Sequence, residues 1–180
     1  MKAHANSGFT LVELCFGATI LVAVLLAVGG AHGTLNRLLN TASTLGTLQQ
    51  RTMVAMDKIA TELKWAEADA LLVTSESGSA RLDLRVPIGF LGGQPVWSPT
   101  ITYKVVPATG DSNGNGLHDE YRLVRQQAGT AERTVCSDLA AGGFAAVRSG
   151  NSIVLTLRVE RRADGRNHRH DATTSVGLRN

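Results

Sequence analysis

Residues 8–31 read GFTLVELCFGATILVAVLLAVGGA. From Phe9 to Ala31 this stretch contains 23 residues and one charged side chain, Glu13. As a helix that rises about 1.5 Å per residue, a run of this length spans the hydrocarbon core of a bilayer. A cleaved secretory signal has a shorter apolar region and a more basic start. The stretch therefore predicts a membrane-spanning helix in the first part of the chain.

The remainder of the chain has the composition of an ordinary soluble domain. The first 50 of the 180 residues carry three charges, Lys2, Glu13 and Arg37, and the other 130 residues carry 30. The two cysteines, Cys15 and Cys136, are too few for a disulfide framework, and we expect both to be small buried residues. A net charge of +3 does not by itself indicate nucleic-acid binding, which needs clustered basic residues.

Glu13 is the unusual residue of the apolar stretch. A carboxylate at membrane depth costs about 2.5 kcal/mol or more on insertion scales. Between Phe9 and Ala31 there is no Lys, Arg or His to pair with it. Its partner must therefore come from lipid head groups, a chain terminus or another subunit.

The seven residues Gly8–Leu14, GFTLVEL, resemble the cleavage and methylation motif of type IV pilins and type II secretion pseudopilins. The resemblance implies that a prepilin peptidase removes the leader Met1–Gly8 by cutting after Gly8, and that Phe9 is then N-methylated. Glu13 becomes the fifth residue of the mature chain. In this family that carboxylate meets the terminal amine of a neighbouring subunit, which supplies the partner that a buried charge needs.

The resemblance also implies what the chain does. It would be a structural subunit of a type IV pilus or a type II secretion pseudopilus, held in the bacterial inner membrane by one helix with its C-terminal domain in the periplasm. Thr173–Asn180 and Met56–Leu63 resemble parts of minor pseudopilins of the J type and minor pilins of the W type. The implied partners are prepilin peptidase, other pilins or pseudopilins, and the membrane. A DNA-uptake pilin and a filament-tip adhesin stay open as alternatives.

Beyond Arg37 the apolar side chains recur at helical spacing, at steps of three and four residues. The stripe consists of Leu38, Ala42, Leu45, Thr52, Met56, Ile59 and Leu63, interrupted by Gln49. No proline occurs before Pro87. We therefore expect one helix from about Phe9 to about Ala68. Residues 9–31 would form its membrane and filament-core part, and residues 32–68 an amphipathic continuation; a coiled coil is the alternative.

From residue 69 to residue 180 the apolar period changes to two, which is typical of strands. The expected strands are Ala80–Val86, Ile101–Val105, Tyr121–Leu123, Ile153–Val159 and Thr173–Leu178. One apolar face per strand indicates an antiparallel sheet that is covered on one side. The predicted fold is α+β, a pilin-like layout in which a long N-terminal helix packs on an antiparallel sheet of four or more strands.

Residues 111–120, DSNGNGLHDE, resemble the start of an EF-hand calcium loop. The candidate ligands are Asp111, Asn113, Asn115, Leu117 through its carbonyl, Asp119 and Glu120. The twelfth position, where a bidentate acid is expected, is Arg122. The alternative is a polar hairpin turn, because Asn-Gly pairs favour tight turns. We expect that the chain requires no cofactor, and that calcium, where it binds, orders the loop without taking part in catalysis.

The C-terminal part of the chain carries a basic stretch, for which DNA contact is the functional hypothesis. Its members are Arg158, Arg161, Arg162, Arg166, His168, Arg169 and His170. No aromatic residue lies between them to stack on bases, so we expect a solvated loop with arginines at subunit contacts. Two histidines without a third ligand do not make a transition-metal site. The sequence has no nucleophile-elbow, P-loop, zincin or dinucleotide-binding motif, and we expect no enzyme activity.

Overall fold

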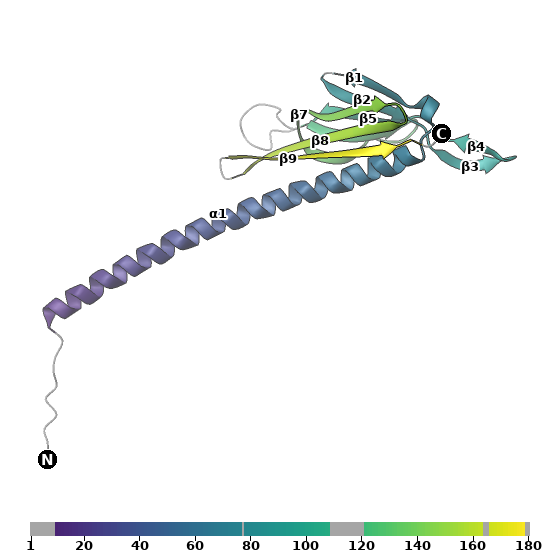
Figure 1. The fold of residues 1–180 in the computed structure, drawn as a ribbon. Coiled ribbons are helices and arrows are strands. Elements are labelled where there is room, and N and C mark those ends of the chain that lie inside the picture. Colours follow the sequence, from purple (N-terminus) through teal and green to yellow (C-terminus); the bar gives the residue numbers. More distant parts are fainter. Residues whose placement is uncertain (1–9, 77, 109–120, 164–165, 179–180) are drawn as a thin grey trace, which may run out of the picture. The chain divides into compact units, whose positions relative to one another are not determined.

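The computed structural model describes residues 10–76, 78–108, 121–163 and 166–178. The chain divides into two compact units, Met1–Ala42 and Ser43–Asn180. The helix α1, Leu11–Lys64, has 54 residues and belongs to both units (Figure 1). A short 3-10 helix, η1 (Ala68–Ala70), and the strands follow it.

The strands form one large sheet and one separate hairpin. Their bounds are β1 Leu72–Glu76, β2 Ser79–Leu84, β3 Pro87–Leu91, β4 Gln94–Trp97, β5 Ile101–Pro107, β6 Tyr121–Gln127, β7 Arg133–Ser149, β8 Ser152–Ala163 and β9 Arg166–Gly177. Seven of them pair in the order β1-β2-β5-β6-β7-β8-β9, with every pair antiparallel, while β3 pairs only with β4. The expected α+β fold, a long helix with an antiparallel sheet of more than four strands, is confirmed.

The helix ends four residues earlier than the sequence predicts. The amides of Trp65 and Ala66 bond to carbonyls three residues back, at 3.2 and 3.1 Å, which tightens the last turn. The amide of Glu67 then bonds to the carbonyl of Arg85 at 3.1 Å. The helix ends here because the amide of Glu67 bonds to the carbonyl of Arg85 instead of to a carbonyl of the preceding helical turn.

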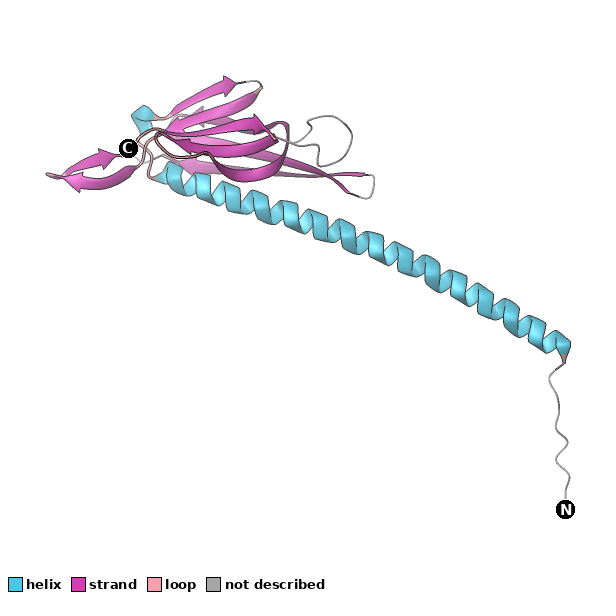
Figure 2. Ribbon diagram, turned by 180° about the vertical axis from the view of Figure 1, so that it is seen from behind, coloured by secondary structure: helices cyan, strands magenta, loops and turns pink. Residues whose placement is uncertain are grey.

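The core lies between the end of α1 and one face of the sheet (Figure 2). The helix contributes Leu48, Thr52, Ala55, Met56, Ile59 and Leu63. The sheet contributes alternate residues, among them Leu82, Leu84, Ile101, Tyr103, Ile153, Leu155, Leu157 and Val159. This alternation confirms the strand pattern. The predicted helical stripe is buried only from Leu48 onward. Its earlier members Leu38 and Leu45 are 62% and 39% exposed.

The sheet is curled, and β7 makes the bend. The pairing of β7 with β8 shifts between Leu139 and Phe144. Asp138 and Gly142 have φ angles of 61° and 66° on either side of Leu139. At Gly143 a Cβ atom would lie 2.5 Å from the carbonyl oxygen of Arg158, so only glycine fits. The bend carries β7 back into contact with β2, which is not its neighbour in the sheet order.

Candidate functional site

Thr10 and Glu13 form a capping box at the start of α1. The carboxylate Oε2 of Glu13 accepts hydrogen bonds from the amide and the hydroxyl of Thr10, both at 3.0 Å. The hydroxyl oxygen of Thr10 accepts in return from the amide of Glu13 at 3.3 Å. Two amides that no helical carbonyl can reach are therefore satisfied by side chains. The sequence signal was the spacing of Thr10 and Glu13 directly before an apolar run.

The charge of Glu13 has no partner of opposite sign among the described residues. The ion pairs found in this part of the chain all lie between Arg51 and Asp171. The amino end of the helix carries a partial positive charge, which stabilises a carboxylate in the first turn. The capping box therefore satisfies the hydrogen bonds of Glu13, while its charge meets no ion-pair partner within the described part of the chain. Gly8 and Phe9, the predicted processing residues, lie outside the described residues.

The apolar surface that follows Glu13 is uncovered. Among the described residues α1 is the one helix long and apolar enough to cross a membrane, with a mean hydropathy of 2.6 over its most apolar 18 residues, none of them buried. Its large exposed side chains include Leu11, Leu14, Phe16, Ile20, Leu21, Leu25, Leu26 and Val28. They lie on all sides, and a helix that is apolar all round is one that lipid or other helices surround. This agrees with anchoring by a single membrane helix.

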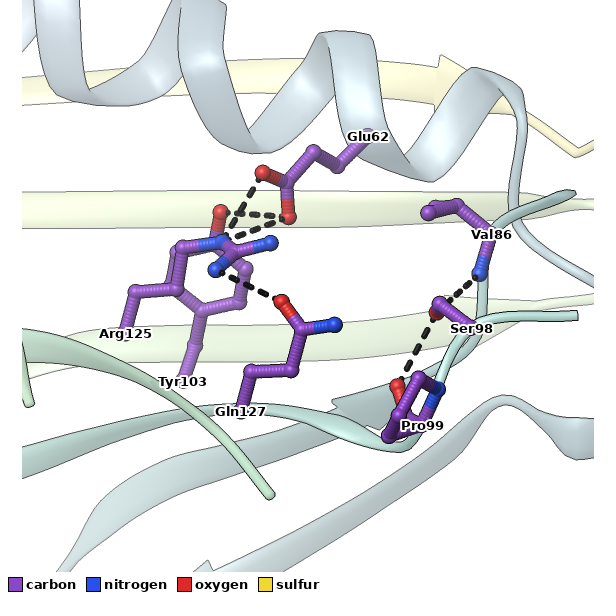
Figure 3. A network of polar contacts seen from close by, with 7 residues as sticks. All are labelled: Glu62, Val86, Ser98, Pro99, Tyr103, Arg125 and Gln127. Carbon is purple, nitrogen blue, oxygen red and sulfur yellow. Dashed lines mark hydrogen bonds and ion pairs between the residues drawn. The ribbon is translucent and has the colours of Figure 1, made fainter. Parts of the chain in front are cut away.

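A part-buried polar network joins the end of α1 to the sheet (Figure 3). Glu62 accepts a hydrogen bond from the hydroxyl of Tyr103 in β5 at 2.8 Å, and from Nε of Arg125 in β6 at 2.9 and 3.2 Å. Arg125 also donates to Gln127 at 3.4 Å. Burial and the nearby Glu62 carboxylate raise the pKa of Tyr103 well above its ordinary value, so the phenol stays protonated.

A second polar link lies nearer the middle of the helix. Nη1 of Arg51 donates to Oδ2 of Asp138 at 2.7 Å and to the Ser137 hydroxyl at 3.2 Å. Asp138 is 8% exposed and occupies the left-handed backbone region, so this contact sits at the bend of β7. Arg51 and Glu62 are about 16 Å apart along the helix axis. The helix is therefore held on the sheet at two points, and the sequence analysis predicted neither.

The structure does not test the proposed calcium loop. Asp111, Asn113, Asn115, Leu117, Asp119 and Glu120 all lie outside the described residues. Arg122, at the position of the missing acidic ligand, belongs to β6, and its Nη1 lies 3.4 Å from the Thr134 hydroxyl oxygen, to which it donates. Within the described ranges, no group of three His, Cys, Asp or Glu side chains is placed to hold a metal ion. Calcium binding stays a prediction.

The basic stretch and Cys15 are placed differently from expectation, whereas Cys136 is placed as expected. The arginines lie on the paired strands β8 and β9, and Asp171 pairs with Arg158 at 3.4 Å and Arg169 at 2.8 Å. The hydrogen bond from Arg169 lowers the pKa of Asp171. Cys136 is buried as predicted, and burial raises its pKa to about 11. Cys15 is exposed on the apolar part of the helix, contrary to expectation, because no protein segment covers it there.

Comparison of the chain with protein-family models, curated proteins and solved structures finds no match. The function therefore has to be inferred from the residues themselves. Two features carry it. One is Glu13, which has no ion-pair partner among the described residues and lies at the start of an uncovered apolar helix, and the other is the pair of polar contacts that join the second half of this helix to the sheet.

Proposed function

We propose that the chain is a minor pilin or pseudopilin, a structural subunit of a type IV pilus or type II secretion pseudopilus. A prepilin peptidase cuts after Gly8 and methylates Phe9, and the mature helix then moves from the inner membrane into a filament. The observation that carries the proposal is the motif Gly8–Leu14 at the start of a 54-residue helix whose first part is apolar and uncovered.

The apolar surface of the helix suits both environments that the proposal requires. Lipid tails and the side chains of neighbouring helices are similarly apolar, so transfer from the bilayer to a helical core costs little in hydrophobic free energy. What changes is the environment of Glu13. In lipid its charge has only the helix end and Thr10, whereas in a filament it meets the methylated amine of a neighbouring Phe9. A pair of opposite charges is far cheaper to bury than one charge alone.

The polar contacts at Arg51 and Glu62 hold the second half of α1 on the sheet of the same chain. A filament under load transmits force from its helical core to its surface domains. Both contacts join the helix to the sheet through charged hydrogen bonds, which are about twice as strong as neutral ones. In the proposed filament they keep each surface domain at a fixed position on its own helix.

The test separates the charge of Glu13 from its capping role. Glu13→Gln keeps a capping side chain, since glutamine serves at this position of a capping box, but it removes the charge. Glu13→Leu removes both. The full chain would be expressed in a bacterium that has prepilin peptidase and a filament machine. The fraction recovered in sheared or cross-linked filaments would then be measured beside the fraction in membranes.

Both variants are expected to enter the membrane and to fall at least about tenfold in filament recovery, since a charge pair of this kind is worth several kcal/mol when buried. A matched control is Asp57→Asn, which removes an exposed carboxylate from the second half of the same helix. Normal incorporation of Glu13→Gln, with loss only in Glu13→Leu, would show that the cap and not the charge matters, and would contradict the assembly role.

A further inference from the structure

The hairpin of β3 and β4 stands apart from the main sheet. The two strands pair only with each other through a turn at Gly92 and Gly93, whose φ angles are 59° and 80°. At the base of the hairpin, the hydroxyl of Ser98 accepts from the amide of Val86 at 3.1 Å and donates to the carbonyl of Pro99 at 2.9 Å (Figure 3). A two-stranded hairpin alone is only marginally stable in water, so this one is a candidate for further contacts.

The hairpin exposes large apolar side chains. Ile88, Phe90 and Leu91 are 65%, 76% and 78% exposed. Large apolar side chains that are exposed together on one element often mark an interaction surface. The hairpin is therefore a candidate interaction surface.

The inner side of the hairpin bounds a cavity of about 620 Å³. We call it the aromatic groove; its side chains come from the turn after α1 and from β3 and β4. The residues that define it are Trp65, Asp69, Pro87, Phe90, Pro95 and Trp97. Its lining residues include three aromatic residues and two acidic ones, Glu67 and Asp69, and no Lys or Arg. An aromatic face beside a carboxylate is the chemistry that binds a guanidinium group.

One of the two carboxylates is already paired and the other is not. Glu67 lies 2.9 Å from the guanidinium of Arg85. Asp69 is exposed and forms no ion pair within the part of the chain that the structure describes. The groove therefore has one acid available for an incoming cation.

Suitable cations lie on the same domain, at the far end of β8 and β9. Arg161, Arg162 and Arg166 are exposed next to the point where these two strands meet, and none of them pairs with another described residue. Arg158 and Arg169, by contrast, are bound to Asp171. The ends of β8 and β9 thus carry three exposed arginines that form no ion pair within the described ranges.

The two surfaces cannot meet within one chain. Arg148, before the turn into β8, donates to the carbonyl of Ala68 at 3.1 Å, which places this turn beside the groove. From Ser152 the strand β8 runs nine residues to Arg161, about 30 Å at 3.3 Å per residue. Figures 1 and 2 agree that the β3–β4 hairpin and the joined end of β8 and β9 lie at opposite ends of the sheet.

We propose that the aromatic groove of one copy of this chain binds the arginine-bearing end of β8 and β9 of a second copy. The contact is head-to-tail, because the two surfaces differ and lie at opposite ends of the domain. Contacts of this kind continue from copy to copy, into a closed ring or an open row according to the rotation between neighbouring copies. The inference goes beyond the proposed function, since it depends only on the domain after Ser43 and holds whether or not the helix enters a filament.

The first test is disulfide trapping in the full chain, purified in detergent, with Cys15→Ser to remove the exposed thiol. One preparation carries Ala68→Cys, in the groove lining beside Asp69, and a second, with a different tag, carries Asn167→Cys beside Arg166, so that the charged residues of the proposed contact are all kept. Under mild oxidation the head-to-tail contact gives a disulfide between the two preparations and little within either one. Asp57→Cys in place of Ala68→Cys is the control, at an exposed position outside the groove. Mixed dimers no more abundant than with this control would overturn the proposal.

The second test is a charge exchange, read by mass photometry and tryptophan fluorescence. Trp65 and Trp97 are the only tryptophans in the chain and both line the groove, so their emission reports its occupation. Asp69→Arg should weaken self-association about tenfold or more. Mixing it with a chain that carries Arg161→Glu, Arg162→Glu and Arg166→Glu should restore the mixed dimer and the emission shift. A self-association that neither change affects would contradict the proposal.

Both tests are carried out in detergent, where no filament forms. A failure here therefore leaves the role of Glu13 untouched, and a failure of Glu13 variants to show an assembly defect leaves the groove untouched. Thermal unfolding of each variant shows whether a lost contact reflects a lost fold.

Discussion

The two halves of α1 share one continuous helical backbone, but the first half is exposed and the second half is covered on one side. From Thr10 to Asn40 every residue is exposed, whereas from Leu48 to Leu63 a buried residue recurs every three or four positions. The second half therefore has one apolar side and a sheet that covers it. The first half is apolar all round and has no cover among the described residues, so its stability in a cell depends on lipid or on other helices. Changes in the two halves should act on different properties.

The largest difference should come from equal truncations in the two halves. Ile59 is fully buried, and Ile59→Ala should lower the free energy of unfolding of the domain by about 2–5 kcal/mol. Leu25 is 62% exposed, and Leu25→Ala should leave that free energy within about 0.5 kcal/mol of the parent. Chemical denaturation of the full chain in detergent, followed by tryptophan emission, measures both. Equal destabilisation would mean that the first half also packs on the domain.

The bend of β7 should be nearly as sensitive. Gly143→Ala places a Cβ atom 2.5 Å from the carbonyl oxygen of Arg158, and the backbone of β8 has to move to make room. Overpacking of this kind costs about 1–3 kcal/mol. Gly177→Ala, where no atom lies within 4 Å of the new Cβ, is the matched control. A melting temperature as high as that of the control would show that the bend is not fixed at Gly143.

The helix-to-sheet contact should have an intermediate effect. Tyr103→Phe leaves one oxygen of Glu62 without its phenol donor, and should cost about 1–3 kcal/mol. Tyr121→Phe, at a half-buried tyrosine in β6, is the control. Urea unfolding of both proteins would measure the difference. If the two variants are equally stable, the network of Figure 3 does not hold the helix on the sheet.

The smallest effect should be a pH dependence at the edge of the sheet. The pKa of Asp171 is lowered by Arg169, so its folded form binds a proton less readily than its unfolded form. The stabilisation is therefore complete above the unfolded pKa, near pH 4, and is lost as the pH falls through the folded value. Hydrogen exchange in β9 should speed up over this range, and Asp171→Asn should remove the change. A change of the same size in the variant would assign it to other groups.

The sequence predicted those elements whose pattern repeats. Alternation marked β2, β5, β6, β8 and β9, and helical spacing marked α1. It did not reveal β7, because the register shift and Gly143 break the period of two. It also missed β3 and β4, since a hairpin that contributes no residue to the core does not need alternating apolar residues. Only the packed fold brings Glu62 to Tyr103 and Arg125, 41 and 63 residues further on.

The candidate site was predictable to a different extent. Glu13 stood out because a single charge interrupts an apolar run, and Thr10 could have been added from the spacing of a capping box. The aromatic groove could not be predicted from the sequence, because Trp65, after α1, and Trp97, in β4, are brought to the same cavity only by the fold. Surfaces of this kind depend on where elements end, which is the least regular part of any sequence pattern.

The central claim is that the chain is a processed subunit whose first apolar half leaves the membrane for a filament. It is tested most directly by the mass of the N-terminal peptide of the full chain, purified from cells that contain a prepilin peptidase. The account predicts loss of Met1–Gly8 and one added methyl group on the amine of Phe9. A mature protein that keeps Met1–Gly8, or that begins at another residue, would contradict it.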